Sequence, residues 1–494
     1  MTDTNPSAGQ HVLVLAFNAP TRDIRVLKQI GSLSRAGYNV STFAPIGVKD
    51  MEPADVDFAL DQYWIGSAQH KLQARELHSL MQSPCGKALF AGAVDDLLAR
   101  TAEQGEMQRD LMRRVFRLGR LVAMLHWSVQ VRRTQVESLR NLRKWFADAQ
   151  LRDGDGPNRV LIAARYGEQV LRFCDSDPQW QARLKAVGPP RIVHAHDLST
   201  LAAGAVLADR YGAKLIYDAH EYEPENTPRL PADERKVIEL IEDRALSGAA
   251  GLITVSDNIA KLYGRRHPDL DLALVYNCPD HRLTDRTVQQ LRPRLGLGPD
   301  VPLMVFVGLP TLEERGLGVV LEAMTHLPDL HLAVIGPRWA KQDAELAGAV
   351  QGAGLEARVH LMEPVAPTDV ITAIGDADVS VCLFRETSLN QRFAMPNKLF
   401  ESLLAGVPLL VSDLPDMAAL VQRMQAGLAV DQADPEAIVE AIRTLLQRRA
   451  DFVPTDAARD ALEQNCSWEG QEQTLLALYD RLLADPAGSD STAS

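Results

Sequence analysis

One short stretch of the chain gathers the residue types that bind a phosphorylated ligand carrying hydroxyl groups. Between residues 395 and 413 the pattern predicts a turn, a helix and a short apolar strand. Asn397, Lys398 and Glu401 lie close together near the start of that helix. An amide, a cation and a carboxylate can therefore point at one ligand together with the free backbone amides of the helix end.

A second set of polar side chains follows two apolar runs in the first half of the chain. Residues 191–197 and 214–222 each have the pattern of a buried strand that ends in polar residues. Open α/β sheets bind their ligands at the carboxyl ends of the strands. The candidates for lining such a site are His196, Asp197, His220 and Glu221. The alternative is that these side chains only cap the two strand ends.

A third group is suited to a phosphate. The apolar run 303–307 leads into a turn at Gly308, and Arg315 precedes a predicted helix. Backbone amides and a guanidinium would then face the same anion. The alternative for Arg315 is a solvated surface arginine, but a cation is unfavourable at the N-terminal end of a helix.

The composition excludes several classes of protein. A formal charge of −13 and an isoelectric point near 5.5 argue against general nucleic-acid binding. The five cysteines lack metal-ligand spacing and fit a reducing compartment better than a disulfide framework. No apolar run approaches the ~18–20 residues of a membrane span, and the first ten residues lack the apolar core of a signal peptide. We therefore expect a cytoplasmic protein.

The elements that position these groups alternate between strand and helix, which predicts an α/β fold with parallel sheets. Residues 11–43 form a predicted βαβ unit, and the loop after its first strand should lie at the ligand crevice. The polar residues of that loop are Asn18, Thr21, Arg22, Asp23 and Arg25. They are candidates for lining the cleft; the alternative is a helix start capped by Thr21 or Asp23.

Residues 67–150 break this alternation and have a mostly helical pattern. Within them, residues 109–144 contain ten Arg or Lys against two acids, interleaved with apolar and aromatic residues. One interpretation is a basic amphipathic surface that contacts anionic lipid from the cytoplasmic side. The other is a helical hairpin that packs its apolar face on the main domain, which is more common for amphipathic helices.

Four motifs together resemble those of a known enzyme family. They are His-Ala-His-Asp at 194–197, Asp-x-His-Glu at 218–221, Arg-Gly-Leu at 315–317 and Pro-Asn-Lys-x-x-Glu at 396–401. The chain resembles one branch of the retaining glycosyltransferases of GT-B fold, family 4, over about residues 11–45 and 190–484. It departs from the commoner pattern of two glutamates eight positions apart, since Phe393 stands where the first would be. The contact to the donor sugar is thereby left unassigned, and the usual glycine-rich loop is absent.

The resemblance implies two Rossmann-like, doubly wound domains. The first spans 1–290 and contains the helical insertion 67–150. The second spans 300–464 and binds the nucleotide sugar. A C-terminal helix, 465–484, is expected to cross back onto the first domain, and the region around 283–300 is expected to be the hinge.

The resemblance also implies the chemistry. A sugar would pass from a nucleotide sugar to a glycan, lipid-linked or small-molecule acceptor with retention, without a metal or other cofactor. The implied catalytic residues are His196, Arg315 and Lys398. The implied donor-binding residues are Gly308, Arg315, Ser388, Asn390, Asn397, Lys398 and Glu401. The implied acceptor-side residues are Arg22, Asp197, His220 and Glu221.

Two alternatives come from other functional classes. A nucleotide-sugar epimerase shares the fold, although the motif pair at 218–221 and 396–401 is closer to the transferases. A catalytically weak subunit could scaffold a glycan-synthesis complex through residues 67–150. The missing first carboxylate favours this second alternative, whereas the retained Arg315, Lys398 and Glu401 argue against it.

Overall fold

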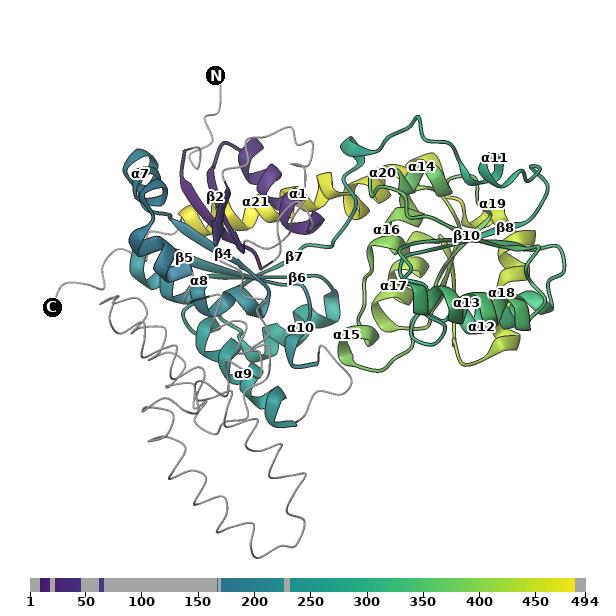
Figure 1. Cartoon of the computed structure of the whole chain (residues 1–494). Helices are drawn as coiled ribbons and strands as arrows, with labels where there is room; N and C mark the ends of the chain where they lie inside the picture. Colours follow the sequence, from purple (N-terminus) through teal and green to yellow (C-terminus); the bar gives the residue numbers. More distant parts are fainter. Residues whose placement is uncertain are drawn as a thin grey trace, which may run out of the picture.

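The computed structural model contains two α/β domains, each built on one parallel sheet (Figure 1). It describes residues 9–17, 23–45, 62–65, 167, 170–225 and 232–484. The strand orders are β3-β2-β1-β4-β5-β6-β7 in the first domain and β10-β9-β8-β11-β12-β13 in the second. The predicted fold class, two Rossmann-like domains in a GT-B arrangement, is confirmed.

The first sheet is covered by helices on both faces. Its strands are β1 (His11–Leu15), β2 (Asn39–Pro45), β3 (Gln62–Ile65), β4 (Ile192–His196), β5 (Lys214–Ala219), β6 (Gly251–Thr254) and β7 (Asp271–Leu274). The helices described in this domain are α1 (Ile24–Arg35), α7 (Pro178–Val187), α8 (Asp197–Tyr211), α9 (Ala232–Leu246) and α10 (Asp257–Arg266). Strands β3 and β7 at the two edges were not predicted from the sequence.

Strand β1 shows why such strands are continuous apolar runs. Leu13 and Leu15 pack in the core cluster that contains buried residues of α8 and α9. Val12 and Val14 point to the other face and pack with α1 and the C-terminal helix. Because both faces are buried, every position of the strand must be apolar, and no alternation with polar residues is seen.

The second domain repeats this construction around a six-stranded sheet. Its strands are β8 (Leu303–Val307), β9 (His331–Ile335), β10 (Val359–Met362), β11 (Val379–Cys382), β12 (Leu409–Ser412) and β13 (Gly427–Val430). The helices that follow the hinge are α11 (Leu291–Leu295), α12 (Leu317–Thr325), α13 (Ala340–Gly352), α14 (Val370–Ile374), α15 (Leu389–Arg392), α16 (Asn397–Leu404), α17 (Pro415–Met424), α18 (Pro435–Gln447) and α19 (Arg449–Phe452). The last two helices are α20 (Asp456–Cys466) and α21 (Trp468–Ala484).

Each sheet reverses its strand order at one place, and these switch points decide where ligands can bind. In the first sheet the reversal lies between β1 and β4, and in the second between β8 and β11. Loops leaving the carboxyl ends of such strand pairs diverge and open a crevice. His196 ends β4 and Gly308 follows β8, so both switch points carry residues of the predicted site.

The chain crosses between the domains twice, before α11 and again between α20 and α21. In Figure 1, α21 runs in yellow along the first domain beside α1. Trp468, Leu475 and Tyr479 of α21 are fully buried in the core cluster of the first domain. The last helix therefore completes the first domain's core, although it follows the second domain in sequence.

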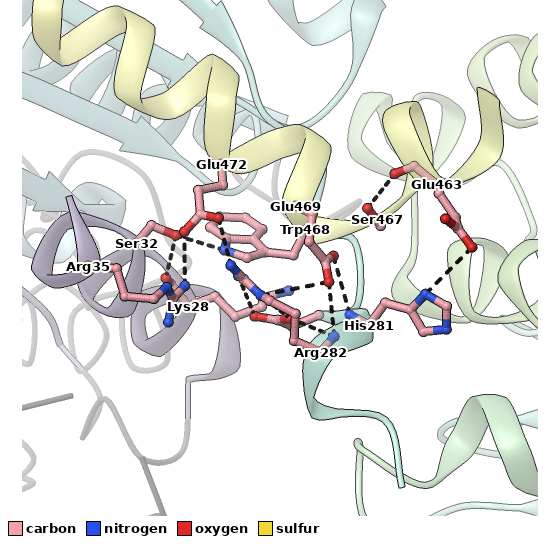
Figure 2. Close-up of polar contacts among 11 residues, drawn as sticks. Lys28, Ser32, Arg35, His281, Arg282, Glu463, Ser467, Trp468, Glu469 and Glu472 are labelled. Atoms are coloured by element: carbon pink, nitrogen blue, oxygen red, sulfur yellow. Dashed lines mark hydrogen bonds and ion pairs between the residues drawn. The ribbon is translucent and has the colours of Figure 1, made fainter. Parts of the chain in front are cut away.

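Polar contacts join α1, the hinge and the start of α21 (Figure 2). The Trp468 indole N–H donates to Ser32 Oγ at 2.9 Å, and its backbone N–H donates to the Pro279 carbonyl at 2.9 Å. Glu472 accepts from the guanidinium groups of Arg35 and Arg282, both at 2.9 Å. The two crossings are thus fastened to each other and to α1.

Two regions named in the sequence analysis lie outside the described residues. They are the loop before α1, with the candidates Asn18, Thr21 and Arg22, and the segment 67–150 with its basic part 109–144. The lipid and hairpin interpretations of that segment therefore stay predictions. Among the described helices, none is both long and apolar enough to cross a membrane.

Candidate active site between the two domains

Helix α16 places two residues of the Pro-Asn-Lys-x-x-Glu motif, Asn397 and Glu401, at a cavity between the domains. Pro396 precedes its first turn in an extended conformation, and no side chain caps the free amides there. The apolar face of α16, including Leu399 and Phe400, is buried in the second domain's core. Asn397 and Glu401 line a cavity of about 110 Å³, whose other walls come from α1 and the hinge. The sequence motif is therefore directed at the space between the domains.

Lys398 is a buried cation whose ammonium makes no hydrogen bond to any described residue. The residue is 6% exposed, and Nζ lies 4.1 Å from the ring centre of Phe306 and 5.2 Å from that of Phe384. Burial lowers the pKa of Lys398 to about 8. An ammonium held over aromatic faces without a hydrogen-bond acceptor is poised for an anionic ligand.

Arg315 and Lys398 both lie over the aromatic ring of Phe384. Its guanidinium lies 4.2 Å from the ring centre of Phe384, and burial lowers its pKa from the usual value. The two cations thus meet around one phenylalanine that follows β11. Phe384 was not predicted as a site residue; the signal was an aromatic residue at the carboxyl end of a strand beside the switch point.

Gly308 shapes the backbone beside these cations. It has φ of +117°, which only glycine adopts readily, and its N–H donates to the Ile335 carbonyl at 2.9 Å. A Cβ on Gly336 would lie 1.9 Å from the Gly308 carbonyl oxygen. Two strand-end glycines therefore pack backbone against backbone, which keeps the turn after β8 open for a ligand.

Glu401 faces the first domain. It is 9% exposed, and burial raises its pKa to about 7 against the opposing effects of Lys28 and Lys398. Lys28 lines the same cavity from α1 and donates to Asn277 Oδ1 at 2.9 Å and to the Cys278 carbonyl. Burial lowers the pKa of Lys28 to about 8.

Lys28 was not among the predicted site residues, although the sequence of α1 contains a pattern that indicates it. Four polar residues of α1 are buried, and they are Arg25, Lys28, Gln29 and Ser32. Their spacing of three, four and seven positions places them on one helix face. A polar stripe on the face that covers a sheet indicates buried polar partners below it. These partners are Asp218 in β5, the segment 275–278 after β7, and Trp468 of α21.

The histidine motifs form one buried polar cluster at the ligand edge of the first sheet. His196 Nδ1 lies 3.0 Å from His220 Nε2, and Asp218 Oδ2 lies 3.4 Å from His196 Nδ1. Asp218 accepts from Arg25 at 3.0 and 2.8 Å and from Gln29 at 2.6 Å. Burial alone would raise the pKa of Asp218, but Arg25 and the histidines hold it well below its usual value.

Arg25 and Asp23 have roles other than lining the cleft, which was one interpretation of the sequence. Arg25 is 2% exposed and forms a buried ion pair with Asp218. Asp23 caps α1 by accepting from the Val26 N–H at 3.2 Å, which was the alternative for that residue. Of the two other acids, Glu221 is exposed, whereas Asp197 lies 3.4 Å from His220 Nδ1.

The histidine cluster has the atom types of a metal site, and Nε2 of His194 and of His196 has no hydrogen-bond partner in the described chain, but Asp218 is already paired with Arg25. Ligand-type atoms of His194, His196 and Asp218 lie within 4.8 Å of one another, as do those of Asp23, Asp197 and His220. Both oxygens of Asp218 accept hydrogen bonds from α1, and the Arg25 guanidinium would repel a cation. The groups therefore fit an internal ion-pair network better than a bound metal.

Helix α15 and its flanking residues include Ser388, Asn390 and Phe393, of which the last two contact the first domain. Asn390 Oδ1 accepts from the Tyr222 N–H at 2.6 Å, and its Nδ2 donates to the Tyr222 carbonyl at 3.2 Å. Phe393 packs against the first domain's core cluster, and Ser388 caps α15 by accepting from the Gln391 N–H. These three side chains are engaged with protein in this arrangement of the domains.

Comparison with known proteins identifies the kind of protein that the chain resembles. A sequence model described as "Glycosyl transferases group 1" matches residues 301–448, and one described as "Glycosyl transferase 4-like domain" matches residues 91–278. The chain is 26% identical over 305 residues to D-inositol 3-phosphate glycosyltransferase of Xylanimonas cellulosilytica, covering 58% of this chain and 71% of that protein. It is 24% identical over 365 residues to the Nocardioides sp. protein of that name, covering 67% of this chain and 73% of that protein.

Solved structures share the fold at low sequence identity. Sucrose-phosphate synthase from Thermosynechococcus elongatus has a TM-score of 0.59 at 14% identity and covers 96% of this chain and 99% of its own. Anabaena Alr3699/HepE, solved with UDP and glucose, has a TM-score of 0.56 at 13% identity and covers 95% and 98%. With two Rossmann-like domains, and with one of the two matched models on each domain, the chain is similar to glycosyltransferases of GT-B fold.

Proposed function

We propose that the chain transfers a sugar from a nucleotide sugar to an acceptor bound on the first domain, with retention of configuration. The observation that carries this proposal is the buried ammonium of Lys398, which has no hydrogen-bond partner in the described chain and lies beside Arg315. Two cations at a glycine turn and a free helix end suit the diphosphate of such a donor. Glu401 would bind the ribose hydroxyls.

The charges of the site suit the transition state of this transfer. As the bond between the sugar C1 and the phosphate oxygen breaks, negative charge develops on the departing diphosphate. Preorganised cations and amides facing that charge are usually the largest stabilising contribution in an enzyme. We propose that Lys398, Arg315 and the amides after Gly308 take this role.

Retention requires the acceptor to approach from the side of the leaving group. The acceptor oxygen then bonds to C1 on that face, and the leaving phosphate oxygen takes the acceptor's proton. No carboxylate pair of the kind used by glycoside hydrolases is then needed, which agrees with Phe393 standing where a glutamate is usual. We propose that neither a metal nor another cofactor takes part, since Arg315 and Lys398 supply the positive charge.

The named ligands of the relatives suggest where to begin testing. UDP and glucose are bound in Anabaena Alr3699/HepE, and a trehalose-6-phosphate structure from E. coli holds UDP-2-fluoro glucose. The first donor to test is therefore UDP-glucose, with GDP- and ADP-sugars beside it. D-inositol 3-phosphate is the first acceptor to test, because several relatives carry its name.

The decisive experiment compares wild type with Lys398→Ala for binding and for release of nucleoside diphosphate across this panel. The matched control is Arg448→Ala, which removes one exposed positive charge away from the cleft. We expect one nucleotide of the panel to bind to wild type and to the Arg448→Ala control. Its binding should be lost in Lys398→Ala. If the folded wild type binds no member, the transferase proposal is wrong and the scaffolding alternative gains support.

A further inference from the structure

The contact between His196 and His220 restricts which ring nitrogens can carry protons. The two ring nitrogens lie 3.0 Å apart, with ring centres 5.3 Å apart and ring planes at 70°. One proton must lie between the two nitrogens, so one ring donates and the other accepts. The direction of this hydrogen bond decides which nitrogen of His196 carries its remaining proton.

The surroundings of His220 make it the donor. Its Nδ1 lies 3.4 Å from Asp197 Oδ1, and its Nε2 lies 3.6 Å from Asp218 Oδ2. Burial alone would lower the pKa of His220, but the two carboxylates outweigh it and raise the pKa to about 9. At neutral pH His220 is therefore an imidazolium with a proton on each nitrogen.

Three acids and two basic residues of the described chain face His220. They are Asp23 and Arg25 of α1, His196 of β4, Asp197 of α8 and Asp218 of β5. Arg25 acts against the imidazolium, but its guanidinium is bonded in a bidentate manner to Asp218. His196 would also oppose a charge on His220 if it were itself charged, which the shared hydrogen bond excludes.

Asp197 is held in a strained conformation beside His220. Its φ is +61°, and among the described non-glycine residues only Gln425 also has a positive φ. Backbone strain of this kind persists where the surrounding structure enforces it, and it clusters at functional sites. Here it lets Asp197 begin α8 while its carboxylate lies against His220.

His220 Nε2, at 3.0 Å, is the nearer of two possible partners for His196 Nδ1. Asp218 Oδ2, 3.4 Å away, already accepts from Arg25 Nε at 3.0 Å and from Gln29 at 2.6 Å. His194 stacks on His196 with ring centres 4.4 Å apart, and its own Nδ1 lies 2.8 Å from the Tyr479 hydroxyl. The His196 ring is thereby fixed from two sides. Its Nε2 is buried without a hydrogen-bond partner in the described chain.

We propose that His220 is a positioning residue that acts as a cation and fixes His196 as the tautomer with its proton on Nε2. His196 then donates a hydrogen bond from Nε2 to an oxygen of the sugar bound in the cleft, and does not accept the acceptor's proton. The identity of that oxygen rests on the proposed function. The tautomer does not, because only protein groups determine it.

The first test measures the tautomer directly in the ligand-free, full-length protein. Histidine is labelled with ¹⁵N, the signal of His196 is assigned with His196→Asn, and proton-coupled ¹⁵N spectra are recorded from pH 6 to pH 10. We expect His196 to carry its proton on Nε2 until about pH 9, where His220 loses its charge. Neutral His220 should keep the proton on Nδ1 facing Asp197, so His196 should then change tautomer. A proton on His196 Nδ1 at pH 7 would overturn the proposal.

A pair of substitutions tests the consequence for turnover. His220→Gln still offers an N–H to His196 Nδ1, whereas His220→Glu offers only acceptor oxygens and forces the other tautomer. We expect kcat of the Gln variant to stay within about tenfold of wild type and that of the Glu variant to fall by about 100-fold, with similar donor KM. Equal losses in the two folded variants would contradict the proposal.

Asp197→Asn gives an independent check if the Glu variant does not fold. Removing this carboxylate lowers the pKa of His220, so the tautomer change of His196 should move below pH 9. An unchanged midpoint would contradict the assigned role of Asp197. Because the spectra need no substrate, a wild type without transferase activity would refute the proposed function and leave the tautomer measurement decisive.

Discussion

Lys398 and Glu401 share one helix turn and have opposite responses to burial. Burial lowers the pKa of the lysine to about 8 and raises that of the glutamate to about 7. Both groups are therefore partly neutral near physiological pH in the free protein. A diphosphate beside Lys398 would favour its charged form, so ligand binding and proton binding must be linked.

Binding of a nucleoside diphosphate should accordingly take up protons. At pH 8 about half of the Lys398 amines are neutral, so saturation with the bound nucleotide should take up about half a proton per site. At pH 6 the amine is already charged, and its contribution should vanish. Calorimetric titration in two buffers with different ionisation enthalpies measures this number. The control is Lys398→Arg, which stays charged; the same uptake in this variant would show that another group is responsible.

The contact of Gly336 with Gly308 allows a second residue-scale prediction. In Gly336→Ala, the new Cβ would meet the Gly308 carbonyl oxygen at 1.9 Å, so the turn after β8 must move. We expect a loss of about 1–3 kcal/mol in the free energy of unfolding. Nucleotide affinity should fall by about tenfold or more, because amides near the diphosphate are displaced.

Gly348→Ala in α13 is the matched control for this change. A Cβ there meets nothing within 4 Å, and alanine is the better helix former by up to about 1 kcal/mol. Urea unfolding and nucleotide titration should show no loss in the control. Wild-type affinity in folded Gly336→Ala would mean that the turn after β8 does not contact the donor.

At the scale of elements, α15 forms a second contact between the domains, on the side of the cleft away from the hinge. We call this contact, made by Leu389, Asn390 and Phe393, the latch. Asn390 makes two hydrogen bonds to the backbone of Tyr222, and Leu389 and Phe393 pack against the first domain. The Tyr222 hydroxyl in turn accepts from Arg266 at 3.4 Å, which is paired with the buried Glu242. The latch is thus anchored to a polar network inside the first domain.

Asn390→Ala distinguishes a latch from a donor-binding residue. If Asn390 mainly holds the domains together, nucleoside diphosphate affinity should stay within about threefold, and the separation of the domains should increase. Two fluorophores, one on each domain, measure that separation by energy transfer. If the affinity falls by tenfold or more without a change in separation, the sequence-based role of Asn390 as a donor ligand is correct.

At the scale of the whole molecule, α21 makes the stability of the first domain depend on the end of the chain. Trp468 is fully buried, its indole N–H is bonded to Ser32, and Lys28 Nζ lies 4.8 Å from its ring centre. Leu475, Leu478 and Tyr479 extend this contact along the sheet. Removing α21 would expose an apolar face of the first sheet to water.

Trp468→Ala should therefore lower the free energy of unfolding by about 3–5 kcal/mol, as for other fully buried large side chains. Trp468→Phe keeps most of the ring and should lose only about 1–2 kcal/mol, chiefly for the indole hydrogen bond. Trp339→Ala is the control, since that side chain is 60% exposed and should change stability by less than about 0.5 kcal/mol. Urea denaturation followed by circular dichroism measures all three; an unchanged midpoint for Trp468→Ala would show that α21 does not stabilise the first domain.

The sequence by itself determined the fold class and the position of its chemistry along the chain. Short apolar runs predict strands buried on both faces, and polar residues directly after them predict the ligand edge. His196, Gly308 and Lys398 could be singled out in this way because each is specified by its neighbours within a few residues. The missing carboxylate at Phe393 was visible for the same reason.

Only the tertiary structure decided how these groups are paired. Arg25 meets Asp218 across 193 positions of sequence, Lys28 meets Cys278 across 250, and Asn390 meets Tyr222 across 168. A local pattern carries no information about such partners, because they depend on how helices cover the sheets and how the domains close. The pKa shifts of Lys398, Glu401 and His220 follow from the same packing, since burial and neighbouring charge exist only once the chain is folded.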